Sequence, residues 1–213
     1  MKISIKICGI SSTETLRKLE NLNIAYIGFI FYERSKRYID VRKAEEIFKS
    51  INYKIKTIGV FVDPSDNYIA NILNRVPLSG IQLHGQETPN RIEEIKKQTN
   101  ILTIKAIPIE SKKDIMIAHD YENICDMLLF DGKTQNSKLP PGGNAIKFDW
   151  KLLNSENWRC PWFLSGGLNV NNVKEAIEMS NAKYVDVSSG VENESGIKDS
   201  VLIEKFVSKI DEI

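Results

Sequence analysis

Eight short apolar runs alternate with amphipathic stretches along the chain, and no other feature of the sequence limits its fold as strongly. Amphipathic stretches of about 10 to 13 residues between such runs are typical of repeated βα units. The apolar runs that we expect to form strands are 3–8, 25–31, 56–62, 80–84, 102–107, 127–131, 162–166 and 184–189. The stretches that we expect to form helices are 12–22, 41–51, 64–76, 88–98, 111–121, 148–154, 169–179 and 198–210.

Eight strands and eight helices in strict alternation predict a closed (β/α)8 barrel, the TIM-barrel fold of the α/β class. The alternative is a doubly wound open sheet, which usually has about five to seven strands. A length of 213 residues is ordinary for one barrel. Because no linker or shift in composition divides the chain, we expect a single barrel domain over residues 1–213.

Three helix starts carry local signals. Ser11 precedes Glu14 by three residues and predicts a capping box, with Ser12 as a weaker alternative cap. Pro64 stands where a first helical turn is expected. Thr88 is expected to cap the helix that it opens.

The charge balance excludes several classes of partner. Lysine and arginine number 29 and aspartate and glutamate 28, so the net charge of +1 gives no general attraction to nucleic acid or to an anionic membrane. The N-terminal stretch lacks the apolar core of a signal peptide. No apolar run approaches the roughly 18 residues of a membrane helix. We therefore expect a cytoplasmic protein without a nucleic-acid or membrane partner, in which a local site binds any anionic ligand.

Cysteine and histidine are too few and too scattered for the common metal sites. Cys8, Cys125 and Cys160 are an odd number without a C-x-x-C spacing, which argues against a disulfide framework and a zinc cluster. His84 and His119 are the only histidines, which argues against a multi-histidine catalytic metal. We expect reduced thiols and no metal.

Polar residues and glycines gather where the expected strands end, which is where barrels of this kind keep their working residues. They are Cys8, Gly9, the loop 32–38, Asp63, Gln82, His84, Gly85, Asp131, Gly132, Gly166, Gly167, Asp186, Ser188, Ser189 and Gly190. Asp63 is expected to serve as a turn and helix-cap residue. Cys8 is either a small buried hydrophobe, as free cysteine often is, or a reactive group at a strand end. Local sequence leaves both interpretations open.

The last two strand ends predict a phosphate site. In "LSGGLN" and "DVSSGVE", glycines allow backbone N–H groups to approach an anion closely, and a following helix adds a positive dipole. The loops after the seventh and eighth strands often bind phosphate in this fold. The alternative is a pair of ordinary glycine turns.

Two further side chains are candidates for ligand chemistry. Arg37 lies in a basic loop, which is often simply solvated, but its planar guanidinium matches a carboxylate in two-point geometry. Asp131 follows the apolar run "MLLF". A carboxyl group that is partly buried there can keep its proton and donate it near neutral pH. Cys125 and Cys160 have no comparable setting.

The motifs together resemble the phosphoribosylanthranilate isomerase family of tryptophan biosynthesis. The matching stretches are "KICGI", "GFIFYERSKRYI", "IGVFVD", "IQLHGQE", "LLFDG", "FDW", "LSGGLNVNNV" and "VDVSSGVE" followed by "GIKD". They span almost the whole chain in the family's order. The resemblance implies an Amadori rearrangement of the phosphosugar N-(5-phosphoribosyl)anthranilate to 1-(2-carboxyphenylamino)-1-deoxyribulose 5-phosphate, without a metal or organic cofactor.

Carried onto this chain, the resemblance assigns a role to each candidate. Cys8 would be the general base and Asp131 the general acid, and Arg37 would hold the anthranilate carboxylate. The remaining substrate contacts would come from Gln82, His84 and Asp186, and the phosphate contacts from Gly166, Gly167, Ser188, Ser189 and Gly190. A thiolate base at Cys8 requires nearby positive charge to lower its pKa from about 8.5.

One stretch departs from the family, which usually has "GGTG" where this chain has "GGNA" at residues 142–145. If Ala145 needed a positive φ, the closed loop would carry a strain of about 1 kcal/mol. We expect an ordinary φ, because a working loop adjusts around alanine.

Rival functions remain at this point. They are the histidine-pathway aminoaldose isomerase, which resembles a two-aspartate pattern, a metal-dependent epimerase, and a phosphate-binding module without catalysis. Polar outer helix faces favour a monomer.

Overall fold

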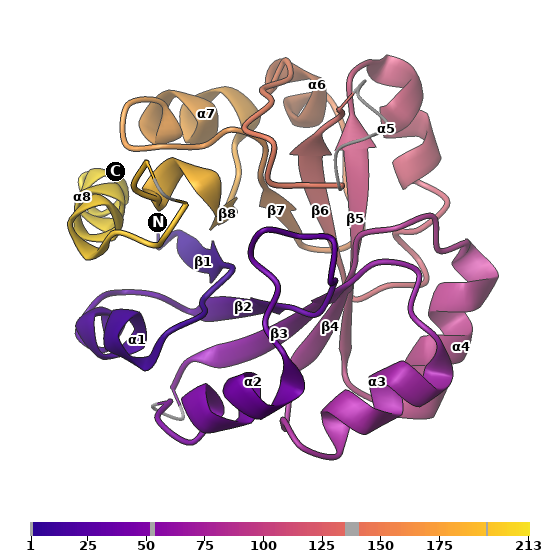
Figure 1. Cartoon of the computed structure of the whole chain (residues 1–213). Coiled ribbons are helices and arrows are strands. Elements are labelled where there is room, and N and C mark those ends of the chain that lie inside the picture. The colour runs from indigo at the N-terminus through magenta and orange to yellow at the C-terminus, as the bar shows by residue number, and fades with distance from the viewer. Residues whose placement is uncertain (1, 52–53, 135–140, 195) are drawn as a thin grey trace.

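Eight parallel strands follow one another in chain order and close into a barrel in the computed structural model, which describes residues 2–51, 54–134, 141–194 and 196–213 (Figure 1). They are β1 (Ser4–Cys8), β2 (Tyr26–Ile30), β3 (Lys56–Phe61), β4 (Gly80–Leu83), β5 (Leu102–Ile109), β6 (Met127–Gly132), β7 (Trp162–Leu164) and β8 (Tyr184–Val187). Pairing of β1 with β8 closes the barrel. The prediction of a barrel is confirmed, and the open sheet is wrong.

Helices cover the outside of the barrel (Figure 1). They are α1 (Thr13–Leu19), α2 (Val41–Phe48), α3 (Asp66–Leu73), α4 (Pro89–Thr99), α5 (Lys112–Ala118), α6 (Lys151–Asn154), α7 (Val173–Ser180) and α8 (Ser200–Asp211). A short 3-10 helix, η1 (Ser189–Val191), follows β8. None of the helices in the described ranges has the length and apolar character needed to cross a membrane.

The start of α1 differs from the predicted capping box. The alternative cap, Ser12, is confirmed, because its hydroxyl oxygen accepts a hydrogen bond from the Thr15 N–H at 3.1 Å. The predicted pairing of Ser11 with Glu14 is therefore wrong. Glu14 instead accepts a bond from Lys18 one turn later, at 2.9 Å.

Of the predictions for the starts of α3 and α4, the first is wrong and the second is confirmed. Ser65 caps α3, so Pro64 lies before the helix and not in its first turn, as was predicted. The serine side chain satisfies a backbone N–H that proline cannot. Thr88 caps α4 as predicted, with its hydroxyl oxygen accepting from the Arg91 N–H at 3.3 Å.

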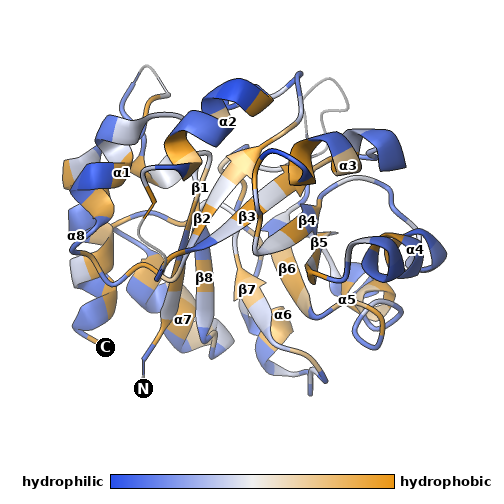
Figure 2. Cartoon of the chain, turned by 90° about the horizontal axis from the view of Figure 1, so that it is seen from below, coloured by the Kyte–Doolittle hydropathy of each residue, from blue (hydrophilic) through white to orange (hydrophobic). Residues whose placement is uncertain are grey.

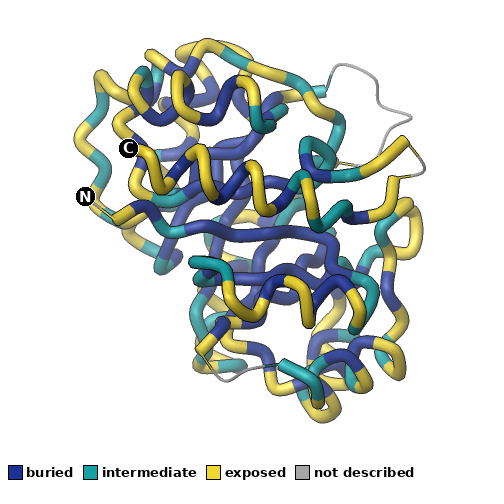
Figure 3. The backbone as a smooth tube through the Cα atoms, turned by 90° about the vertical axis from the view of Figure 1, so that its left-hand side faces the viewer, coloured by how far each residue is buried: buried dark blue, intermediate teal, exposed yellow. Residues whose placement is uncertain are grey.

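Two apolar layers build the molecule. One lies between the outer face of the barrel and the helices, and includes Ile5 and Ile7. The other fills the interior of the barrel with Tyr26, Ile58, Ile104, Ala106, Met127, Leu129 and Phe163. Figure 3 shows the strands buried and the helices exposed on their outer sides, and Figure 2 shows α4 as largely hydrophilic. This packing leaves only the two ends of the barrel interior for polar chemistry.

A buried ion pair joins the loops that follow β3 and β4. Lys105 on β5 lies 2.7 Å from Glu87 and donates to the Gly85 carbonyl at 2.8 Å. Glu87 also accepts the N–H of Asp63 at 2.8 Å, and Asp63 accepts the N–H of Gln86 at 2.7 Å. Asp63 has a φ of +45° and is thus a turn residue, but the prediction that it caps a helix is wrong.

We expect Lys105→Met to lower the free energy of unfolding by about 3–5 kcal/mol, because it leaves the Glu87 carboxylate buried without its cation. Urea denaturation measures the loss. The double variant Lys105→Met/Glu87→Gln should recover part of it, because no unpaired charge then remains. Equal stability of wild type and Lys105→Met would contradict the role of this pair.

Candidate active site

A pocket lies at the carboxyl ends of the barrel strands. Its lining includes the predicted residues Cys8, Arg37, Gln82, His84, Asp131, Gly166, Gly167, Asp186, Ser188 and Ser189. Gly190 is the one predicted site residue that the lining does not include. The fold therefore brings nearly all of these residues to one place, while their individual roles stay predictions.

Strand alternation explains why these side chains meet. Successive side chains of a strand point to opposite faces, and paired residues of neighbouring strands share a face. The register pairs Lys6 with Asp186 and Val60 with Gln82, which places all four inside the barrel. The interior residues that line the pocket are Cys8, Ile30, Val60, Gln82, Asp131, Ser165 and Asp186. The apolar interior layer lies on the same strands, toward their starts.

Two glycines make room around Cys8. Gly28 stands opposite Cys8 on β2, and a Cβ atom there would lie 2.8 Å from the Cys8 sulfur. Gly9 has a φ of +85°, and a Cβ atom there would lie 2.9 Å from Cδ of Arg37. The glycine of "KICGI" therefore turns the chain after β1 and lets the arginine stem lie against it. Gly28 was missed in the sequence, although a glycine inside a strand often marks such a close approach.

Burial dominates the electrostatics of Cys8. It raises the pKa of the thiol, with a smaller contribution of the same sign from Asp186, while Lys6 and Lys198 act to lower it. A lowered pKa, which the sequence-based interpretation of a thiolate base required, is thus not what the structure shows. Desolvation of the charged form outweighs the two lysines.

Lys6 is the cation nearest to Cys8 along the chain, although no role was predicted for it. It is fully buried and donates to Asp186 at 2.9 Å. Burial acts to lower the pKa of Lys6, but Asp186 and Cys8 outweigh it and raise that pKa. A lysine two residues before Cys8, between Ile5 and Ile7, was a readable signal, since it shares the interior face with the thiol.

Asp131 belongs to a chain of polar contacts on the other side of the pocket. Its Oδ1 accepts the Gly132 N–H at 2.9 Å, and its Oδ2 lies 3.5 Å from Nε2 of His84. Nδ1 of His84 lies 3.0 Å from Nε2 of Gln82. Within the described ranges, Oε1 of the buried Gln82 has no hydrogen-bond partner. The contacts orient His84 toward Asp131 and leave one buried acceptor beside the pocket.

The end of the loop after β6 lies across this pocket. A Cβ atom on Gly142 would lie 2.6 Å from the His84 ring, and one on Gly167 would lie 2.8 Å from the Ala145 carbonyl oxygen. Ala145 itself has a φ of +56°. The expectation of an ordinary φ at this position is therefore wrong. The backbone keeps a left-handed turn although the side chain has a Cβ atom.

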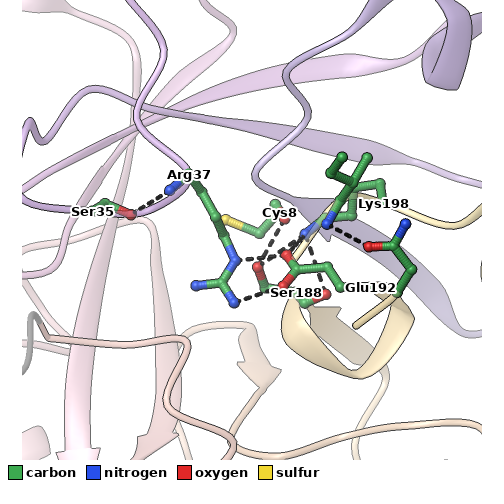
Figure 4. Close-up of polar contacts among 8 residues, drawn as sticks. Cys8, Ser35, Arg37, Ser188, Glu192 and Lys198 are labelled. Atoms are coloured by element: carbon green, nitrogen blue, oxygen red, sulfur yellow. Dashed lines mark hydrogen bonds and ion pairs between the residues drawn. The ribbon is translucent and has the colours of Figure 1, made fainter. Parts of the chain in front are cut away.

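Arg37 makes its main contact with a residue that had no predicted role. Its Nε and Nη2 donate to the two carboxylate oxygens of Glu192 at 2.6 and 2.8 Å (Figure 4). Lys198, which is almost fully buried, also bonds to Glu192. Both residues lie in stretches that carried the family resemblance, "SSGVE" and "GIKD". No spacing rule links them to Arg37, so the sequence alone could not place them together.

The two glycine loops lie side by side at the ends of β7 and β8. Gly166 and Gly167 have φ values of +85° and +65°, which glycine adopts without strain. A Cβ atom on Gly190 would lie 1.9 Å from the Leu168 carbonyl oxygen, so this glycine allows the two loops to pack. Ser188 donates from its hydroxyl to the Cys8 carbonyl at 3.0 Å and ties the second loop to β1.

The other two cysteines lie at the opposite end of the barrel. Cys125 precedes β6 and Cys160 precedes β7, whereas Cys8 ends β1. The Cys125 thiol donates to the Tyr121 carbonyl oxygen at 3.1 Å. The proximity of the two thiols raises the pKa of Cys125 and lowers that of Cys160. Neither lines the pocket, so both are suited to serve as controls for Cys8.

Comparisons with known proteins agree with the motifs. The family model of N-(5'-phosphoribosyl)anthranilate (PRA) isomerase matches residues 5–209. The N-(5'-phosphoribosyl)anthranilate isomerase of Rhodospirillum centenum is 40% identical over 209 residues, which are 98% of each chain. The family resemblance predicted from the motifs is confirmed.

Solved structures extend the agreement to the fold. A crystal structure of phosphoribosyl anthranilate isomerase in complex with reduced 1-(o-carboxyphenylamino)-1-deoxyribulose 5-phosphate matches 99% of this chain and 100% of its own, at 32% identity and a TM-score of 0.86. A structure of monomers generated from the dimeric Thermotoga maritima isomerase matches the same shares at 33% identity and a TM-score of 0.85. The prediction that the present chain is a monomer stays a prediction.

The raised pKa of Cys8 can be measured by alkylation, because only the thiolate reacts with iodoacetamide. In a Cys125→Ser/Cys160→Ser background, the alkylation rate of Cys8 should rise with pH and reach its midpoint above about 8.5, the ordinary thiol value. Mass spectrometry of quenched samples gives the rate at each pH. A midpoint below the ordinary value would mean that Lys6 and Lys198 outweigh burial.

Proposed function

The chain belongs to the N-(5'-phosphoribosyl)anthranilate isomerase family, and we propose that it converts N-(5-phosphoribosyl)anthranilate into 1-(2-carboxyphenylamino)-1-deoxyribulose 5-phosphate in tryptophan biosynthesis. The observation that carries the proposal is the placement of a thiol and a carboxyl group in one pocket, on strands separated by β7 and β8. An Amadori rearrangement needs an acid and a base that reach the sugar from different sides. Cys8 and Asp131 have that arrangement.

The acid acts first. Asp131 in its protonated form donates its proton to the furanose ring oxygen while the anilinic nitrogen forms a Schiff base with C1, and the C1–O bond breaks. Asp131 is 7% exposed, so water competes little for this proton. Nε2 of His84 lies 3.5 Å from the carboxyl oxygen.

The base acts second. The Cys8 thiolate removes the proton from C2, and the electron pair moves to give an enolamine. This intermediate becomes the ketone as C1 gains a proton and the C2 hydroxyl loses one, so the overall reaction is an isomerisation. Burial makes the thiolate scarce, but it also strips the base of water, and Lys6 with Lys198 favours its negative charge.

The remaining lining residues fit the two ends of the substrate. Arg37 would bind the anthranilate carboxylate, and backbone N–H groups in the loops of Gly166, Gly167 and Ser189 would bind phosphate. The unpartnered Oε1 of Gln82 would accept a hydrogen bond from a sugar hydroxyl, which relieves the cost of a buried acceptor. The proposed chemistry uses no metal and no organic cofactor.

Three free cysteines suit a reducing compartment, and we place the reaction in the cytoplasm. The deciding assay generates the substrate in situ from anthranilate and phosphoribosyl pyrophosphate, with EDTA present and no cofactor added. We expect turnover of this substrate. Turnover of the histidine-pathway aminoaldose alone would favour that rival, and ligand binding without turnover would favour a binding module.

We expect Cys8→Ser to fold normally and to lose activity by a factor of about 10² or more, because a hydroxyl is a far weaker base than a thiolate. Asp131→Asn should lose turnover as well but still bind the reduced product analogue, since the amide keeps the shape and lacks the acidic proton. Steady-state kinetics and calorimetry measure both. Cys160→Ser is the control and should keep near wild-type turnover, whereas a fully active Cys8→Ser enzyme would refute the assignment.

We expect Ala145→Gly to raise kcat/KM by up to about fivefold, because glycine relieves roughly 1 kcal/mol of left-handed strain in the loop over the pocket. The kinetics should be compared with those of Asn181→Gly. Asn181 also has a positive φ, of +58°, but it ends α7 away from the pocket. An unchanged or lower kcat/KM in Ala145→Gly would show that left-handed strain at residue 145 does not slow the reaction.

A further inference from the structure

The guanidinium of Arg37 offers two edges to carboxylates, and Glu192 occupies only one. Nε and Nη2 donate to Glu192 at 2.6 and 2.8 Å. The second edge consists of Nη1 and the other hydrogen of Nη2. A Cβ atom on Gly143 would lie 2.6 Å from Nη1, and Gly143 and Arg37 both line the pocket. Within the described ranges, Nη1 makes no hydrogen bond, so this edge is the one left for a ligand.

Glu192 is itself firmly held. Lys198, whose side chain is 3% exposed, donates to Glu192 and also to the carbonyl and hydroxyl oxygens of Ser188 at 3.2 and 3.3 Å. The Ser188 hydroxyl in turn donates to the Cys8 carbonyl. Figure 4 shows this set of contacts between the loop after β2 and the end of β8. The arginine is thus anchored to the strand that carries the proposed base.

The charges of this cluster leave it attractive to an anion. Two cations, Arg37 and Lys198, face a single carboxylate, so the three side chains carry a net positive charge in a largely buried setting. Burial acts to raise the pKa of Glu192, but its bonds to Arg37 and Lys198 outweigh burial and lower it. Glu192 is thus held in its ionised form. Burial lowers the pKa of Lys198 although Glu192 opposes this shift, so the positive charge offered to a ligand is that of the Arg37 guanidinium, which does not lose its proton in proteins.

We propose that Glu192 and Lys198 are positioning residues that hold Arg37 by its Nε edge, so that its Nη1–Nη2 edge faces the pocket and binds the carboxylate of the aromatic substrate. This inference rests on the proposed function for the identity of that carboxylate. A free arginine side chain loses several rotamers when it binds a ligand, whereas one that is already held loses few. Glu192 therefore strengthens carboxylate binding without touching the substrate.

The test is Glu192→Gln, which keeps the shape but replaces one acceptor oxygen by a donor. We expect KM to rise about tenfold with kcat nearly unchanged, because carboxylate binding is weakened and the acid and base are intact. The inhibition constant of the reduced product analogue, which carries the carboxylate, should rise similarly. That of inorganic phosphate should not change. Glu192→Asp, which keeps the charge, should give a smaller rise.

A double-mutant cycle separates positioning from a general structural effect. Once Arg37→Ala has removed the guanidinium, adding Glu192→Gln should raise KM no further. The matched control is Glu45→Gln, because Glu45 accepts two bonds from Arg75 at 2.7 and 3.1 Å on the exposed surface, and its loss should leave KM unchanged.

Three results would overturn the inference: an unchanged KM in Glu192→Gln, a lowered KM, which would mean that Glu192 competes with the substrate for Arg37, or additive effects in the cycle. An inactive wild type would instead reject the proposed function. Calorimetry with the reduced product analogue would then still compare wild type with Glu192→Gln and Glu192→Asp.

Discussion

The closed barrel forces every strand to direct alternate side chains into one narrow interior, and the rest of the structure depends on how polar groups there are paired. Apolar side chains fill the part of the interior toward the strand starts. Toward the carboxyl ends, Lys6 and Asp186 form a buried ion pair at 2.9 Å. A buried charge without a partner would cost several kcal/mol, so each of these groups requires the other. The pocket lies toward the carboxyl ends of the strands, where the side chains of the barrel interior change from apolar to polar and paired.

Pairing also sets the chemistry that is available at the pocket. Burial disfavours the charged form of Cys8, while Lys6 and Lys198 favour it. Burial thus favours the neutral thiol, and the nearby cations stabilise the thiolate, which is the form proposed to take a proton from substrate carbon. Asp131, across the pocket, accepts a backbone N–H, and Nε2 of His84 lies 3.5 Å from its other oxygen. One barrel interior thereby places the two groups proposed as acid and base in different environments.

Periodicity was sufficient to predict the eight strands, the helices and the residues at the strand ends, because strand and helix periods are local properties of the sequence. Local capping rules failed at Ser11 and Pro64, where a neighbouring serine could bond the same turn. The contact of Arg37 with Glu192 was out of reach, since 155 residues separate the partners and either could have been solvated. The positive φ of Ala145 was mispredicted because alanine carries no such local signal, and the family's glycine at this position was the one indication of it.

The motif "KICGI" shows why these local and distant effects cannot be separated. Gly9 is needed for its φ of +85° and for the stem of Arg37, while Gly28 on the next strand leaves room for the Cys8 sulfur. A side chain at Gly9 would displace the arginine and strain the strand end together, so the proposed base and the proposed carboxylate site both depend on this glycine. The stretch "GGNA" at residues 142–145, which departs from the family pattern, lies in the loop over the pocket and not beside Gly9 and Gly28. Its alanine can therefore alter how that loop lies over the pocket without moving Cys8, although Gly143 of the same loop lies against Nη1 of Arg37.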